Sequence, residues 1–121
     1  FKMIQRISTI EPGEKQRAAA SGIEFSPDGN HLFVTNAGIN TVIIYDVDKE
    51  TGVLTPLFHC KTSGDYPKAV AVMPDNKHFI VLSHETDEIF IYNMNYEDCY
   101  FLQDSRPIEI EQPNCIFIHK L

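Results

Sequence analysis

The chain has 121 residues, with 17 acidic and 10 basic side chains and a formal net charge of −7. This charge argues against a nucleic acid or an anionic membrane as partner, because both attract Lys and Arg rather than carboxylates. No apolar run approaches the roughly 18 residues of a membrane-spanning helix, and no basic segment precedes an apolar one as in a signal peptide.

The strand-forming segments occur in chain order as two copies of one four-stranded unit, flanked by single strands. Strands are predicted where β-branched and aromatic residues run between turn residues. Residues 2–10 fit the last strand of a preceding unit. The first unit has strands at residues 21–25, 31–35, 41–47 and 53–60, and the second at 69–73, 78–83, 88–94 and, more weakly, 100–103. A strand at residues 112–119 begins a third copy.

The two units are repeats of each other. Ser26-Pro27-Asp28-Gly29 lies 47 residues before Met73-Pro74-Asp75-Asn76, and at this offset apolar positions such as Val34 and Val81 coincide. The proline fixes φ in each turn, and the Asp side chain can bond its own backbone. Four antiparallel strands in every 40–50 residues are typical of a β-propeller blade. We therefore predict an all-β fold that contains about two propeller blades.

Two blades cannot close a ring, because each blade buries its faces against its neighbours. We therefore expect the C-terminal part of one propeller domain, completed by the remaining blades or by other copies of the chain. Within it we assign residues 1–11 to the outer strand of a preceding blade, 18–64 and 66–109 to two blades, and 112–119 to the inner strand of a closing blade.

The spacing of cysteines and histidines indicates no metal site. Cys60, Cys99 and Cys115 are far apart, so they form neither a C-x-x-C pair nor a zinc pattern. The five histidines include no H-E-x-x-H pair. We expect no metal and no cofactor, and we expect a reduced, cytoplasmic protein.

Two turns and the strand between them resemble a known family. Residues 26–36 read Ser-Pro-Asp-Gly-Asn-His-Leu-Phe-Val-Thr-Asn, and residues 47–55 read Val-Asp-Lys-Glu-Thr-Gly-Val-Leu-Thr. In this order they resemble the lactonase-type seven-bladed β-propellers, the family of propeller 6-phosphogluconolactonases and carboxymuconate cyclases. Tyr66-Pro67-Lys68 is similar to the family's Thr-Pro-Arg segment. The strand at 32–36 also resembles YVTN-type repeats, which are usually shorter than the offset found here.

The resemblance implies a carboxylic ester hydrolase of carbohydrate metabolism that opens a sugar lactone such as 6-phosphogluconolactone. This reaction needs cations that hold the anionic substrate and a general base that activates water. Family members carry a Glu and an Arg at the positions of Gly22 and Ala37, so other residues must act if the protein is an enzyme. The alternative is a non-catalytic propeller that binds a small molecule or a protein at the channel mouth.

The candidate binding residues lie in loops that we expect at one mouth of the propeller channel. They are Lys68, His84, Arg17, Asn36 and Asn114, and the expected ligand is a small anion. Lys68 takes the place of the family's Arg and can bind an anion, while the other four offer hydrogen bonds. Plainer interpretations are a solvated loop lysine for Lys68, a surface imidazole for His84 and a strand-end cap for Asn36. No catalytic residue is assigned.

Overall fold

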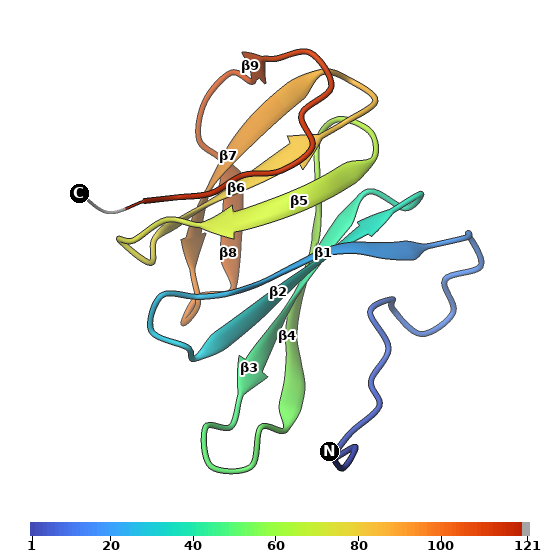
Figure 1. Ribbon diagram of the computed structural model, residues 1–121, viewed down its shortest axis with the longest axis vertical. Helices are drawn as coiled ribbons and strands as arrows, with labels where there is room; N and C mark the ends of the chain where they lie inside the picture. The colour runs from blue at the N-terminus through green and yellow to red at the C-terminus, as the bar shows by residue number, and fades with distance from the viewer. Residues whose placement is uncertain (120–121) are drawn as a thin grey trace.

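The computed structural model describes residues 1–119, and the regular structure in this part of the chain is all β-strand. The first antiparallel sheet contains β1 (Ala19–Phe25), β2 (His31–Ala37), β3 (Thr41–Val47) and β4 (Leu54–Lys61) in that order. The second contains β5 (Pro67–Val72), β6 (His78–Ser83), β7 (Glu88–Asn95) and β8 (Tyr100–Gln103), and the short β9 (Ile108–Glu109) also pairs with β7. Figure 1 shows two twisted sheets with β1 near β5. The predicted all-β architecture of about two four-stranded blades is confirmed.

The strand bounds agree closely with those predicted. β3, β6 and β8 have the predicted bounds, and β1, β2, β4, β5 and β7 differ by one or two residues at one or both ends, while the short β9 was not predicted. The fourth strand of the second blade is weak, as expected, for a reason that the structure shows. β8 pairs with residues Tyr92–Asn95 of β7, and β9 pairs with Glu88 and Ile89, so the outer strand is split into two pieces.

The repeated turns have the geometry that their sequences predict. In the first, Gly29 N donates to Ser26 O at 2.8 Å, and Gly29 has φ 70°. In the second, Asn76 N donates to Met73 O at 2.9 Å, and Asn76 has φ 55°. Gly and Asn are the residues that tolerate this left-handed backbone at low cost. Both turns therefore serve the blade rather than a binding site.

The core lies between the two blades. Because side chains alternate along a strand, Phe33 and Ile44 of the first blade share the face that meets Phe79 and Val81 of the second. The rings of Phe33 and Phe79 are 5.4 Å apart and tilted by 51°. Burial of one such side chain stabilises the fold by roughly 1.5–3 kcal/mol, so this interface holds the blades together.

The other face of the first blade is covered by the N-terminal segment, which forms no strand. We predicted an outer strand at residues 1–11, but its pairing partner would belong to a preceding blade. The segment attaches through side chains instead: Tyr45 Oη donates to Ser8 O at 2.7 Å, and the Gln5 amide bonds both the N–H and the C=O of Leu54. Ile7 packs on the apolar cluster that includes Tyr45.

The C-terminal segment likewise lies beside a blade without pairing as a strand. Residues 113–118 run alongside β5 in Figure 1, and Ile116 and Phe117 border a shallow groove with Glu24 and Val72. The inner strand predicted at residues 112–119 is therefore not formed in this part of the chain. A second strand of its own blade would have to pair with it.

Tyr96 links the blades at the end where the Ser-Pro-Asp-Gly turn lies, a role that the sequence did not suggest. Its ring stacks on His31 with centroids 3.7 Å apart. Its hydroxyl donates to Asn76 Oδ1 at 3.1 Å, and Asn76 Nδ2 donates to Asp28 Oδ2 at 2.8 Å. Burial raises the pKa of Tyr96. The two turns are thus bonded directly to each other, and the Tyr96 side chain supports this bond from the second blade.

Two further findings concern cysteines and membranes. Cys60 is buried in the core between the blades, and burial raises the pKa of its thiol to about 11, so it packs as a small apolar residue. Cys99 and Cys115 are exposed thiols.

Among residues 1–119, no helix is long and apolar enough to cross a bilayer.

The stacked His31 makes stability depend on pH. Burial lowers its pKa below the usual 6.5, although the Asp46 and Asp28 carboxylates act in the opposite direction. The unfolded chain therefore binds the proton more readily than the folded one, so stability is present above about pH 6.5 and is lost as the pH falls through the folded pKa.

We expect the free energy of unfolding, measured by urea titration, to fall between about pH 7 and pH 5. His31→Phe should remove much of this slope, because phenylalanine keeps the stack on Tyr96 and does not titrate. His119→Gln, a change at an exposed imidazole, is the control and should leave the slope intact. An equal slope in His31→Phe and in the unsubstituted protein would show that another group is responsible.

Candidate functional site at the channel-mouth end

The loops predicted to surround a channel mouth lie at one end of the two blades. This end, called the mouth end below, is where β1 and β5 begin and where β2 and β6 finish, on the right and upper right of Figure 1. It holds the β2–β3 and β6–β7 hairpin loops. It also holds the segments that cross from one blade to the next, at residues 62–66 and 110–112. The geometry of the mouth end depends on one set of hydrogen bonds between a hairpin tip and a crossing segment, and this set occurs in both blades.

Each hairpin tip at the mouth end holds the crossing segment that follows its blade. Asn40 Oδ1 accepts from Tyr66 N at 3.1 Å, and Asp87 Oδ1 accepts from Gln112 N at 2.8 Å. The carbonyls of Asn40 and Asp87 accept further backbone N–H groups from the same segments, at 2.8 Å each. Asn40 and Asp87 have φ 54° and 57°, the left-handed region that Asn and Asp tolerate. The repeat therefore includes a side-chain clamp that sequence comparison alone did not show.

The clamped residues adopt an unfavourable backbone conformation directly before a proline. Tyr66 has φ 58° before Pro67, and Gln112 has φ 43° before Pro113. Non-glycine residues in this region cost about 1–3 kcal/mol, and the ring of a following proline restricts them further. Both prolines are buried. The clamp therefore maintains a strained turn that aims the next inner strand, as strained backbone often does at functional sites.

A β-bulge near the start of β1 and another near the start of β5 each project one side chain toward the inner segment that comes next in the chain. The β1–β2 ladder skips Ser21, and the β5–β6 ladder skips Lys68, which lies 47 residues later. Ser21 Oγ donates to Pro67 O at 2.5 Å, and Lys68 Nζ donates to Asn114 Oδ1. Asn114 follows Pro113 as Lys68 follows Pro67. Ser21 thus bonds the residue before Lys68, and Lys68 in turn bonds Asn114 of the C-terminal segment. Bulges of this kind are common beside active sites.

His84 reaches the same part of the C-terminal segment as Lys68. Its Nδ1 is 3.2 Å from Pro113 O, and its backbone N donates to Tyr66 O at 3.0 Å. A carbonyl oxygen can only accept, so Nδ1 carries the hydrogen, and the neutral ring keeps its lone pair on Nε2. His84 and Lys68 are therefore held on the adjacent residues Pro113 and Asn114. His84 corresponds in the repeat to Ala37, so the second blade has a functional group where the first has a methyl group.

The structure separates Asn36 and Arg17 from this group. Asn36 is fully buried in β2, and its Nδ2 donates to Thr9 O at 2.6 Å and to Thr41 Oγ1 at 3.3 Å. It attaches the N-terminal segment and agrees with the plainer structural interpretation. Arg17 is exposed and borders a depression with Ala37 and Tyr66. Of the five candidates, Lys68, His84 and Asn114 come together. The sequence analysis did not identify Ser21, which could have been found because it aligns with Lys68 in the repeat.

Gly22 has a structural reason to lack the family's carboxylate. A Cβ atom there would lie 2.9 Å from Thr35 Oγ1 and 3.1 Å from Lys68 O and from Ala69 Cα. Two of these atoms belong to the backbone of the next inner strand, so a side chain requires the blades to move apart. The close approach of β1 and β5 thus occupies the space that a glutamate would need. Across residues 1–119, no three His, Cys, Asp or Glu side chains are grouped to hold a metal ion.

Asp87→Ala should destabilise the protein by about 1–3 kcal/mol in urea titrations, because it removes the acceptor of Gln112 N and places alanine at positive φ. Asp87→Asn is the matched control, since asparagine keeps both an acceptor oxygen and tolerance of this conformation. Amide hydrogen exchange at Gln112 should quicken only in the alanine variant. Equal stability and equal exchange in the two variants would argue against the clamp.

Comparison with known proteins agrees with this architecture. Residues 1–118 match the family described as "Lactonase, 7-bladed beta-propeller". The chain is 21% identical to the 6-phosphogluconolactonase of Bacillus subtilis (strain 168) over 122 residues, which cover 100% of this chain and 35% of that protein. It is 30% identical to muconate cycloisomerase 1 of Cutaneotrichosporon cutaneum over 104 residues, 83% of this chain and 25% of the relative.

Solved structures give the same fold. The periplasmic gluconolactonase of Pseudomonas aeruginosa superposes with a TM-score of 0.81 at 21% identity, over 88% of this chain and 30% of that one. The chain thus spans about a third of the length of the relatives described here. The family match favours an N-terminal part of the propeller, so it does not support the C-terminal placement that we expected.

Proposed function

The chain belongs to the seven-bladed lactonase propeller family, and from this premise we propose that a complete ring containing these two blades hydrolyses a lactone. One observation supports this more than any other: a cationic side chain, Lys68, and an imidazole, His84, are held on the adjacent residues Asn114 and Pro113 at the mouth end. These are the two kinds of group that lactone hydrolysis needs, a partner for an anionic substrate and a base for water.

The proposed reaction uses the Nε2 lone pair of His84. Nε2 takes a proton from water as the water oxygen adds to the lactone carbonyl carbon, and the carbonyl π electrons move onto oxygen. When this tetrahedral intermediate collapses, the ring C–O bond breaks, and the imidazolium returns the proton to the leaving alkoxide. The product is the open hydroxy acid. The hydrogen bond from Nδ1 to Pro113 O orients the ring and fixes the tautomer that leaves Nε2 free to accept a proton.

Lys68 is proposed to bind the anionic part of the substrate. Its ammonium group already points to an oxygen acceptor, Asn114 Oδ1, and a substrate carboxylate or phosphate is a stronger acceptor than an amide. A phosphorylated sugar lactone such as 6-phosphogluconolactone, acted on in carbohydrate metabolism, fits this chemistry, and we propose it as the substrate. Because Gly22 and Ala37 stand where the family has Glu and Arg, we assign the role of base on these two blades to His84.

The partners that we propose are further propeller blades and a small anionic substrate, in a cytoplasmic protein. The first blade exposes Ile23 and Phe25 of β1, which are 67% and 56% accessible. In a closed ring the preceding inner strands would cover such side chains. The remaining blades of one propeller, or other copies of this chain, can supply that cover, and both routes place additional residues at the mouth end.

In the complete ring, His84→Gln should lower kcat for 6-phosphogluconolactone about 10²-fold, because a general base typically contributes 10²–10⁴. Lys68→Ala should raise KM by ~10-fold or more, since hydrogen bonds to charged groups are worth about 1.5–3 kcal/mol, and Lys68→Arg should restore most of the loss. The rates are measured against spontaneous hydrolysis. Lys77→Ala, a change at an exposed lysine near the opposite turn, is the control.

Two results would count against the proposal. Hydrolysis no faster than the spontaneous rate would favour the alternative of a propeller that only binds a ligand at the same mouth. Full activity in both His84→Gln and Lys68→Ala would show that lactone chemistry occurs at other residues of the ring.

A further inference from the structure

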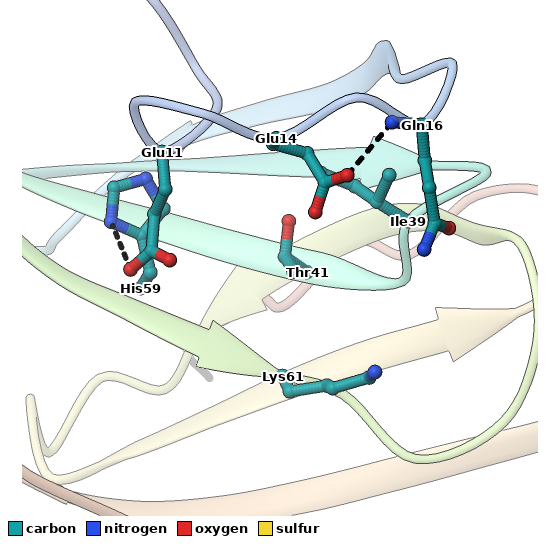
Figure 2. A pocket seen from close by; sticks show the side chains of 7 residues that line it. All are labelled: Glu11, Glu14, Gln16, Ile39, Thr41, His59 and Lys61. Atoms are coloured by element: carbon teal, nitrogen blue, oxygen red, sulfur yellow. Dashed lines mark hydrogen bonds and ion pairs between the residues drawn. The ribbon is translucent and has the colours of Figure 1, made fainter.

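A second recess lies on the outer side of the first blade, apart from the mouth-end group. It is a cavity of about 200 Å³ beneath the segment that leads from the N-terminal residues into β1. Figure 2 shows Glu11, Glu14 and Gln16 on that segment, above Thr41 of β3, with Lys61 of β4 opposite. The recess is at β4, the strand at the outer edge of the first blade. Lys68 lies at the start of β5, which packs beside β1 at the opposite, inner edge. The recess is therefore separate from the proposed lactone site.

One side of the recess carries two carboxylates. Glu14 is fixed by its own loop, because its Oε1 accepts from Gln16 N at 2.8 Å. Glu11 Oε1 lies 3.5 Å from His59 Nδ1. Figure 2 shows the Glu14 carboxylate pointing toward Thr41. This side can hold a group with several N–H donors, since two carboxylates, an amide oxygen and a hydroxyl all offer acceptor lone pairs.

The recess also has a positive charge opposite the carboxylates, and a buried polar atom beside Glu11. Lys61 makes no ion pair or side-chain hydrogen bond within residues 1–119, and its ammonium group lies beyond Thr41 in Figure 2. His59 Nε2 is buried, and nothing in the described part of the chain bonds it. A buried polar atom without a partner costs free energy, which a bound polar ligand can recover.

We propose that this recess binds a small zwitterion with a primary ammonium group and a carboxylate, of which a free α-amino acid is the simplest example. The ammonium group donates to Glu11 and Glu14, and the ligand carboxylate pairs with Lys61. A simple cation would offer no charge partner to the Lys61 ammonium group, and a simple anion would be repelled by the two carboxylates. The volume of about 200 Å³ is below the roughly 300–1,000 Å³ of pockets for drug-sized ligands, so only a ligand as small as an amino acid fits.

The charge pattern and its place in the fold support the same conclusion. Every residue of the recess belongs to the first blade or to the segment before it. The Ile39 side chain borders the recess beside these polar groups and offers an apolar contact for the ligand's side chain. The site is thus predicted to be present whether or not the ring catalyses lactone hydrolysis.

The test is to titrate the intact protein with L-alanine by isothermal calorimetry, with methylammonium and acetate as probes of each half. L-Alanine should bind saturably and at least about tenfold more tightly than either half. Lys61→Met and Glu14→Gln should each weaken L-alanine binding by ~10-fold or more, because each removes one charge partner. Lys77→Met removes a lysine outside the recess and should bind L-alanine as before.

Three outcomes would overturn the inference. The first is no saturable binding of L-alanine up to roughly 10 mM, a concentration that would detect even a millimolar site. The second is methylammonium binding as tightly as L-alanine with no effect of Lys61→Met, which would indicate a cation site only. The third is equal binding in the Lys61→Met, Glu14→Gln and Lys77→Met variants, which would place the ligand elsewhere.

Discussion

The side-chain oxygens of Asn40 and Asp87 each accept the N–H of a residue that precedes a proline, and the mouth end depends on these two bonds. Tyr66 and Gln112 are held in the left-handed region that most residues avoid. The strained turn sets the direction of the next inner strand and places a bulge directly after Pro67, where Lys68 leaves the ladder. The position of the candidate site is therefore a consequence of how one blade connects to the next.

The opposite end of the blades is built for rigidity. Tyr96 stacks on His31 and bonds Asn76, which in turn bonds Asp28, so the repeated turns are fixed to each other. The apolar core between the blades connects this end to the strained one. A scaffold of this kind can hold unfavourable backbone at a site because packing elsewhere stabilises the whole. Because this scaffold is fixed elsewhere, proteins that share the fold can differ in function through a few side chains at the mouth end.

The fold was largely predictable from the sequence because the 47-residue repeat aligns both turn residues and apolar positions, and these determine strands and blades. The site was only partly predictable. Lys68, His84 and Asn114 were identified, but their convergence depends on bulges and positive φ values that residue types do not reveal. Asn36 appeared available and is buried under Thr9. Segments 1–11 and 112–119 were predicted as strands, yet they form none because the neighbouring strands that would pair with them are not part of this chain.

The central claim is that Lys68 and His84 jointly bind and hydrolyse the lactone at Pro113–Asn114. The most direct measurement is a crystal structure of the complete ring with the product 6-phosphogluconate. We expect an anionic group of the product to replace Asn114 Oδ1 as the partner of Lys68 Nζ, with the new carboxylate within hydrogen-bonding distance of His84 Nε2. Product bound elsewhere in the ring, with Lys68 still on Asn114, would contradict it.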